Sequence, residues 1–344
     1  YTIFYMSINI GSMLGFLVCG YLGEKVGWHW GFGAAGVGMT FGVIQYIFSR
    51  KSLGDAGLKP NLEVDEDVSS YKLIFYSVAA LIALAIASNF LGLWQVNAEF
   101  LNQLTVYVIL LVALMYFSYL FFFAGLNKKE RENISMFLLL FLGSVLFWAG
   151  FDQGGSSLNL FAKDYTDLYI FGWEMPATFL QVANPLMVVI FAPFFASFWI
   201  NLGRRNMDFD TPEKFALGCF LMAVGFCVII LGVEVALDNE KAGVKWLLIT
   251  YLFHTLGELC LSPVGLAATA KYSPKKYKGQ MMGLWFLSSS LAAGVAGLLA
   301  SKSFESGIES MPALFNQVIF GLVLIGVVLL IANKYIKGNP VTED

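Results

Sequence analysis

Long apolar stretches alternate with short polar segments along the whole chain, and this pattern predicts ten membrane-spanning helices. A helix needs about 20 mostly apolar residues to cross the hydrocarbon core of a bilayer. The spans are expected at residues 1–22, 29–49, 73–95, 104–124, 134–162, 174–200, 214–235, 246–270, 279–300 and 314–335. The composition agrees, with 58% hydrophobic residues, 13% charged residues and a mean hydropathy of +0.70. We therefore predict an all-α polytopic membrane protein.

The basic residues indicate how these spans are oriented. If successive loops lie on opposite sides of the membrane, one side carries 16 of the 21 Lys and Arg residues, including Lys271, Lys275 and Lys276. Basic residues collect on the cytoplasmic side of membrane proteins. We expect the first span to run from inside to outside and the C-terminus to be cytoplasmic. The expected location is a cell membrane.

A polar segment at residues 50–72 divides the chain. It contains Asp55, Pro60, Glu63 and Asp65 and is predicted to be a cytoplasmic linker between domains. Residues 1–49 precede it with two spans that are rich in small residues. Residues 73–127 follow with two spans that carry no internal charge, so we expect an inserted helix pair that faces lipid. Residues 128–344 hold the remaining six spans and a tail, and most of the polar residues within the membrane lie there.

The span at residues 246–270 carries a carboxylate, Glu258, within the sequence YLFHTLGELCLSPVG. A charge at this depth is unfavourable unless it faces a cavity or a partner, so it marks an ion or substrate path. The alternative is a Glu that only joins two helices. Helical spacing places His254, Glu258 and Ser262 on one face, and Pro263 predicts a kink. His254 could relay protons, or it could be a neutral side chain bonded to a carbonyl group.

Other spans carry further polar candidates. Asp152 lies in FWAGFDQGGSSLNLF, where spacing places Ser156 and Asn159 on the same face and Gly154 and Gly155 permit close approach or local unwinding. Asp152 could instead be an interfacial acid, and Asp164 is expected to be more exposed. In the span at residues 174–200, Asn184 precedes Pro185, which predicts a break in the helix. Trp285 in the span at residues 279–300 could wall a side-chain pocket or fill a gap in the bundle.

We expect Asp152, Asn184 and Glu258 to face one water-accessible cavity, because hydrocarbon does not tolerate them. Nothing in the sequence predicts an enzyme, a cofactor or a metal site. The four cysteines lie inside apolar runs without metal-ligand spacing, and the sequence shows none of the common catalytic or nucleotide-binding motifs. The net charge of −3 does not indicate nucleic-acid binding.

The chain resembles the proton-dependent oligopeptide transporters, the POT family of the major facilitator superfamily. The signature of that family's fifth helix resembles residues 1–13, YTIFYMSINIGSM, and Gly27, Trp28, Gly31 and Phe32 continue the likeness into the sixth. Later helices resemble FWAGFDQ with SSLNLFA, then MPATFLQVANP, GELCLSPVGL and GLW. The resemblance implies the fifth and sixth helices of the N-terminal bundle at 1–49, the inserted pair at 73–127 and the six-helix C-terminal bundle at 128–344.

The resemblance also implies roles for single residues. Glu258 and Asn184 resemble contacts to the peptide amino terminus, and Asn9 resembles a contact to the peptide backbone. Ser262 and Trp285 resemble pocket residues. Asp152 resembles the acid of the extracellular gate, and we group it with Glu258 and Asp164 for proton coupling and gating. These implied roles make the expected partners di- and tripeptides, protons and the lipid bilayer.

The function that the resemblance implies is proton-coupled uptake of di- and tripeptides by alternating access, with this chain carrying the C-terminal half of the peptide site. The chain opens at Tyr1, and the family's first four helices have no counterpart in it, so we expect the missing helices in the full-length protein. Two alternatives stay open. One is a facilitator of another small solute, and the other is a truncated membrane protein that binds peptide or a partner without transport.

Overall fold

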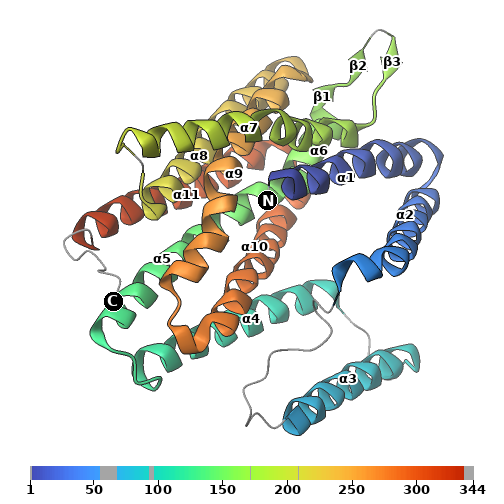
Figure 1. Ribbon diagram of the computed structural model, residues 1–344. Coiled ribbons are helices and arrows are strands. Elements are labelled where there is room, and N and C mark those ends of the chain that lie inside the picture. Colours follow the sequence, from blue (N-terminus) through green and yellow to red (C-terminus); the bar gives the residue numbers. More distant parts are fainter. Residues whose placement is uncertain (1, 55–67, 93–96, 171, 208, 337–344) are drawn as a thin grey trace. The chain divides into compact units, whose positions relative to one another are not determined.

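The computed structural model describes residues 2–54, 68–92, 97–170, 172–207 and 209–336, most of which are helical (Figure 1). Among these residues, 10 helical segments have the length and apolar character needed to cross a membrane. The number of spans predicted from hydropathy is thereby confirmed. Several helices run further than predicted, as in the segment Lys128–Tyr165.

The α-helices, in chain order, are α1 (Thr2–Tyr21), α2 (Trp28–Ser49), α3 (Val68–Phe90), α4 (Ala98–Phe122), α5 (Lys128–Phe151), α6 (Ser157–Tyr165), α7 (Ala183–Arg204), α8 (Thr211–Asn239), α9 (Lys245–Tyr272), α10 (Lys278–Ser306) and α11 (Met311–Ile336). The short helical turns are the π-helix η1 (Leu22–Val26) and the 3-10 segments η2 (Arg50–Leu53), η3 (Asp152–Gly155), η4 (Ala177–Val182), η5 (Lys275–Tyr277) and η6 (Ile308–Ser310).

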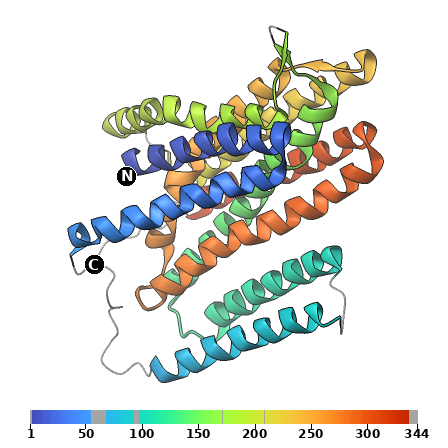
Figure 2. The same ribbon diagram turned by 90° about the vertical axis from the view of Figure 1, so that its right-hand side faces the viewer.

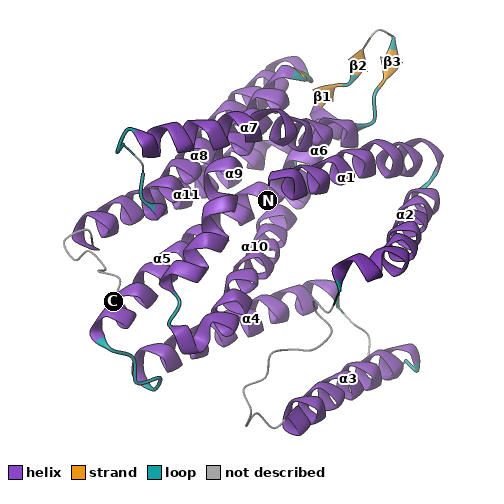
Figure 3. Ribbon diagram, viewed as in Figure 1, coloured by secondary structure: helices purple, strands orange, loops and turns teal. Residues whose placement is uncertain are grey.

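Four short strands lie among the described residues, in the loops beside the helices (Figure 3). They are β1 (Thr166–Asp167), β2 (Tyr169–Ile170), β3 (Trp173–Glu174) and β4 (Ala242–Gly243). Strands β2 and β3 pair as an antiparallel hairpin, and β1 pairs in parallel with β4. The second pairing joins the loop after α6 to the loop before α9, so these two loops lie at the same end of the helices.

The chain divides into two compact units, which are described separately. One holds residues 1–32 and 105–344, and the other holds residues 33–104. The second unit contains most of α2 and all of α3, whose described side chains are nearly all exposed. Most of the linker predicted at residues 50–72 lies outside the described residues, which stop at residue 54 and resume at residue 68.

Helices α5, α8, α9, α10 and α11 pack together as the core of the larger unit (Figure 1). The interior is aromatic, since Phe147, Phe215, Phe226 and Phe315 are all 0% exposed. The rings of Phe226 and Phe315 lie 5.5 Å apart and join α8 to α11. Because lipid is as apolar as these side chains, helices associate in a membrane mainly through such close packing.

Two helices of this core begin at capping boxes, which explains where their first turns form. The Asn127 side chain accepts a hydrogen bond from the N–H of Glu130 at 2.9 Å, and the Glu130 carboxylate accepts one from the N–H of Asn127 at 3.0 Å. Asp210 and Glu213 form the same arrangement at the start of α8. These side chains bond N–H groups that the first turn of a helix leaves without partners.

Helices α8 and α9 approach so closely that glycine is required at their contact. A Cβ atom added to Gly257 would lie 2.7 Å from the carbonyl oxygen of Gly218, and one added to Gly218 would lie 2.9 Å from that of Gly257. One added to Gly225 would lie 2.5 Å from Cδ2 of His254. Small residues let helix backbones meet in this way within membranes. We call this contact the glycine seam and define it by Gly218, Gly225 and Gly257.

The turn between α1 and α2 is also tight. The π-helix η1 ends at Gly27, whose φ of 148° favours glycine and whose N–H bonds to the carbonyl oxygen of Leu22 at 2.7 Å. A Cβ atom on Gly31 would lie 2.7 Å from the carbonyl oxygen of Cys19, so the start of α2 lies directly against the end of α1. Helix α1 itself runs beside α7 (Figure 2).

Two spans change their helical form near the polar residues noted in the sequence. Of the two roles that Gly154 and Gly155 permit, close approach and local unwinding, the structure shows the unwinding, because η3 separates α5 from α6. The break predicted at Pro185 is placed differently. The span changes from 3-10 to α-helix at Ala183, so Pro185 lies in the first turn of α7, where a missing N–H is tolerated. Helix α9 continues as a single helix across residue 263.

The expectation that residues 73–95 and 104–124 both face lipid needs a correction for one face of the second span. Phe117 of α4 packs against Phe141 of α5 with ring centroids 5.5 Å apart, and Val106 occupies the space in front of Gly294 of α10. The buried residues of α4 follow a helical stripe formed by Val106, Ala113, Phe117 and Leu120. One face of α4 is therefore part of the helix packing.

Candidate functional site

Glu258 lies inside the bundle and is held by a side-chain amide. The residue is only 7% exposed. Nδ2 of Asn184 donates hydrogen bonds to Oε2 of Glu258 and to Oγ1 of Thr255, both at 2.9 Å. The Thr255 hydroxyl donates in turn to the carbonyl oxygen of Tyr251 at 2.7 Å. A polar chain thus joins α7 to α9, and the carboxylate faces the protein interior rather than lipid.

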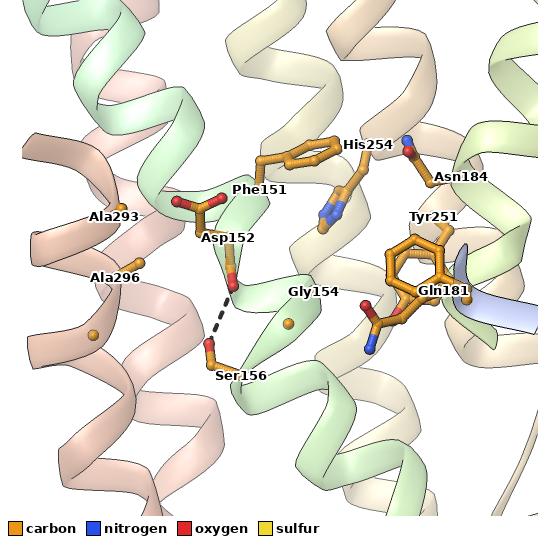
Figure 4. Close-up of a pocket in the computed structure, with 13 residues that line it drawn as sticks. Phe151, Asp152, Gly154, Ser156, Gln181, Asn184, Tyr251, His254, Ala293 and Ala296 are labelled. Carbon is orange, nitrogen blue, oxygen red and sulfur yellow. Dashed lines mark hydrogen bonds between the residues drawn. The ribbon is translucent and has the colours of Figure 1, made fainter. Parts of the chain in front are cut away.

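A cavity of about 410 Å³ lies beside this polar chain, with Asp152 and Asn184 on different walls (Figure 4). Its walls come from α1, α5, η3, η4, α7, α9 and α10. The lining residues are Phe16, Phe151, Asp152, Gly154, Gly155, Ser156, Gln181, Asn184, Tyr251, His254, Ala293, Ala296 and Gly297. Most of this surface is apolar, and the polar groups are few, which is typical of a small-molecule site.

Of the three residues that we expected around one cavity, Asp152 and Asn184 line it and Glu258 does not. Glu258 lies one hydrogen bond behind Asn184. Sequence spacing places both residues at membrane depth, but it cannot tell which of two bonded side chains will face the open space. Asn184 is therefore the described link between the carboxylate and the cavity.

The η3 turn carries Asp152 into the cavity wall, and Gln153 fastens this turn. Gln153 is 0% exposed, its Nε2 donates to the carbonyl oxygens of Ala149 at 3.2 Å and Ala296 at 3.4 Å, and its Oε1 accepts from the Ser157 hydroxyl. An interrupted helix within a membrane needs such partners for its backbone groups. Sequence reasoning missed Gln153, although an amide beside two glycines in an apolar span was a signal.

The face predicted for Asp152, Ser156 and Asn159 is only partly correct. Asp152 and Ser156 line the cavity, and the Ser156 hydroxyl donates to the carbonyl oxygen of Asp152 at 3.2 Å, drawn as a dashed line in Figure 4. Asn159 does not line it. Its Oδ1 accepts a hydrogen bond from Nε2 of Gln181 at 3.0 Å. The 3-10 turn between Asp152 and Asn159 disrupts the helical spacing on which the prediction rested.

Two further polar side chains of α9, Tyr251 and His254, line the cavity and are 4% and 2% exposed. The Tyr251 hydroxyl and Nε2 of His254 have no hydrogen-bond partner among the described residues. The imidazole packs against the ring of Phe226 with centroids 4.8 Å apart and against the glycine seam at Gly225. The bond to a carbonyl group that we considered for His254 is therefore not formed at Nε2. Tyr251 lies one turn before His254 on the same face, and its tyrosine side chain carries no charge that would mark it in an apolar span.

Trp285 does not line the cavity and fills space between helices instead. It is 7% exposed, its ring lies 6.0 Å from that of Phe215 and 6.2 Å from that of Phe137, and it occupies the place that a side chain at Gly265 would need. Trp285 could wall a side-chain pocket or fill a gap in the bundle, and these contacts favour the second role.

The remaining predicted site residues also lie outside the cavity lining. Asn9 of α1 is buried, at 7% exposure. The Ser262 hydroxyl is buried and has no partner among the described residues. Asp164 is exposed near the end of α6, as expected. The structure therefore brings Asp152, Asn184 and the α9 residues together and leaves these three apart.

A family model described as "POT family" matches residues 1–312 of this sequence. The chain belongs to the POT family. Peptide transporter YePEPT of Yersinia enterocolitica subsp. palearctica is similar to this POT chain, with 34% identity over 342 residues that cover 96% of the chain and 66% of that protein. The di-/tripeptide transporter of Lactococcus lactis subsp. cremoris is 27% identical over 344 residues, which cover 97% of this chain and 67% of that protein. The chain thus spans about two thirds of the length of these relatives.

The fold of the POT chain also matches a solved structure. The crystal structure of a peptide transporter POT in complex with sulfate superposes with a TM-score of 0.86 and 33% identity, covering 97% of this chain and 67% of that one. The predicted fold class, an all-α polytopic membrane protein with the helices of the major facilitator superfamily, is therefore confirmed. The POT chain is a multi-pass membrane protein.

Proposed function

We propose that the full-length protein is a proton-coupled symporter that takes up di- and tripeptides, and that this chain carries the C-terminal half of its peptide site. Membership of the POT family and the names of the relatives support this transport function over catalysis. The proposed location is a bacterial inner membrane with the C-terminus in the cytoplasm, supported by the distribution of basic residues.

The observation that carries the proposal is the hydrogen bond between Asn184 and the buried carboxylate of Glu258. A carboxylate inside a membrane bundle can bind the ammonium group of a peptide, and it can also take up a proton when that cation leaves. Asn184 orients the carboxylate and borders the cavity through which a peptide would approach. Occupancy of the site and protonation of Glu258 are in this way linked.

The other candidates take supporting roles in the proposal. Asp152 is the acid of the gate, because it lines the cavity from the η3 turn. Asp164, exposed near the end of α6, belongs to the same gate group. Asn9 and Ser262 complete the peptide site when the bundles close around a substrate, and Trp285 supports that site by packing against Phe137 and Phe215. In alternating access, two bundles open and close around a site near the middle of the membrane.

The test is the Glu258→Gln variant of the full-length protein in proteoliposomes. Gln keeps the shape of the side chain but cannot titrate, so accumulation of a dipeptide driven by a proton gradient should be lost. Dipeptide binding should weaken by about 1.5 to 3 kcal/mol, the value of a hydrogen bond to a charged group. Glu234→Gln, the same change at an exposed position of α8, is the control and should transport normally. Gradient-driven uptake by Glu258→Gln at the parent rate would refute the role of Glu258.

A further inference from the structure

Glu24 reaches from η1 to the start of η4 and accepts two backbone hydrogen bonds there. Its Oε2 accepts from the N–H of Ala177 and its Oε1 from the N–H of Thr178, each at 3.0 Å. Each carboxylate oxygen thus has one donor, and charge-assisted bonds of this kind are stronger than neutral ones. The first N–H groups of a helical segment have no acceptor within that segment. The Glu24 carboxylate supplies acceptors for two of them from a different part of the chain.

The contacts around Glu24 show a close fit between α1 and η4. A Cβ atom on Gly20 would collide with Oγ1 of Thr178 and lie 3.0 Å from its Cβ. The neighbouring Lys25 forms an ion pair with Glu174, with Nζ and Oε2 3.3 Å apart and both side chains partly exposed. Exposed ion pairs contribute little because water and salt screen them. Glu24 and Gly20 therefore contribute more to this contact than the Lys25–Glu174 ion pair does.

The two segments that Glu24 joins each supply a wall of the cavity. On one side, α1 carries Phe16, which lines the cavity about two turns before Glu24. On the other side, η4 runs directly into α7 as one span, Ala177–Arg204. This span contributes Gln181 and Asn184 to the lining, and Asn184 holds Glu258. Fixing η1 to the start of η4 therefore fixes these two walls relative to each other.

We propose that Glu24 is a positioning residue that fastens the α1 wall of the cavity to the η4–α7 wall, and that this contact must release before the cavity can open at that end. The inference rests on the proposed alternating-access function, in which the site opens at one end at a time. The charge distribution assigns this end to the outside. The contact consists of side-chain bonds to backbone N–H groups, so it can part without unfolding either helix.

The test measures access to the cavity from outside. A cysteine reporter replaces Ala293, an exposed lining residue, in a full-length protein whose native cysteines have been replaced. A membrane-impermeant maleimide is added to intact cells. Glu24→Ala should raise the labelling rate about three- to tenfold, equivalent to about 0.7 to 1.4 kcal/mol. Gly20→Ala should raise it as well by separating the same surfaces, and Glu24→Gln should have an intermediate effect because one acceptor oxygen remains.

Lys25→Ala is the matched control, since it removes a neighbouring charge and its exposed ion pair without touching η4. It should leave the labelling rate within about twofold of the parent. Dipeptide transport by Glu24→Ala should change in turnover rate more than in KM, because Glu24 contacts no substrate. Gel filtration in detergent checks that each variant is folded. If Glu24→Ala fails to fold, the labelling rate of Gly20→Ala is used to test the inference.

Labelling at the parent rate in the folded Glu24 and Gly20 variants would overturn the inference, and so would an equal increase in Lys25→Ala. The labelling assay does not depend on transport. If labelling rises as expected while the parent protein takes up no dipeptide, the role of Glu24 stands and the proposed function fails. If the parent protein takes up dipeptide but labelling does not change in the variants, the proposed function stands and the role of Glu24 fails.

Discussion

The Asn184 amide uses its two hydrogens within the bundle, one on Thr255 and one on Glu258. We expect Asn184→Ala to weaken dipeptide binding by about 1.5 to 3 kcal/mol, because the carboxylate loses a donor at a depth where such bonds are strong. Isothermal titration calorimetry on the full-length protein in detergent measures this loss.

Asn159→Ala is the matched control for Asn184→Ala. It removes an amide that bonds to Gln181 rather than to Glu258, so its effect on dipeptide affinity should be much smaller. Equal losses in the two variants would mean that general loosening of the bundle, rather than the contact with Glu258, lowers the affinity.

Sequence reasoning identified single residues where their chemistry conflicts with the membrane. Glu258 and Asn184 stand out because a polar side chain in an apolar span needs a reason. Glu24 does not stand out, since an acid in a short loop is ordinary and its N–H donors, at Ala177 and Thr178, lie more than 150 residues away. Only the folded chain brings this carboxylate to η4.

At the scale of helices, the glycine seam fixes the distance between α8 and α9. We expect Gly257→Ala to lower the free energy of unfolding by about 1 to 3 kcal/mol, because its methyl group would meet the carbonyl oxygen of Gly218 at 2.7 Å, and backbone cannot move aside as a side chain can. Thermal unfolding in detergent, followed by tryptophan fluorescence, gives the change in midpoint.

Gly283→Ala is the control for the glycine seam. Nothing lies within 4 Å of the added methyl group at this position of α10, so the substitution should be neutral or stabilising by up to about 1 kcal/mol. Similar destabilisation by both substitutions would show that the loss of glycine flexibility, and not the contact between α8 and α9, accounts for the effect.

Hydropathy predicts the number of spans well because length and apolar character alone decide which segments can cross a bilayer. It could not predict that α4 packs against α5 and α10 while α3 is exposed. Lipid and protein interior are equally apolar, so the buried stripe of Val106, Ala113 and Phe117 has the same chemistry as a lipid-facing stripe. The paired glycines mark η3 in the sequence as a place of local unwinding or of close approach, and the fold decides between the two.

At the scale of the whole molecule, the loops agree with the alternation of sides assumed in the charge count. The pairing of β1 with β4 brings the end of α6, which carries Lys163, and the loop that carries Lys241 to one end, and the ion pair of Lys25 with Glu174 brings the α1–α2 turn there. All three lysines belong to the side with fewer basic residues. That end is therefore expected to face outward.

This orientation predicts that a cysteine at Lys275 reacts with a membrane-impermeant maleimide only after the cells are permeabilised. A cysteine at Lys241 is the matched control and should react in intact cells. Both positions are exposed, Lys241 in a loop and Lys275 in the short 3-10 segment η5, so access of the reagent differs only by the side of the membrane. Reaction of the Lys275 cysteine in intact cells would reverse the assignment of every loop.

The η3 turn has a geometric consequence for the span that it interrupts. An α-helix advances about 100° per residue and a 3-10 helix about 120°, so four residues of 3-10 turn by themselves add a rotation of about 80° and lengthen the axis by about 2 Å, and the non-helical Ser156 adds a further change of direction. The turn therefore sets the rotational phase of α6, which buries Ser157, Leu158 and Phe161. If η3 were to rewind into regular α-helix, α6 would rotate about its own axis while α5 stayed in place. This rotation would move Asn159 away from Gln181.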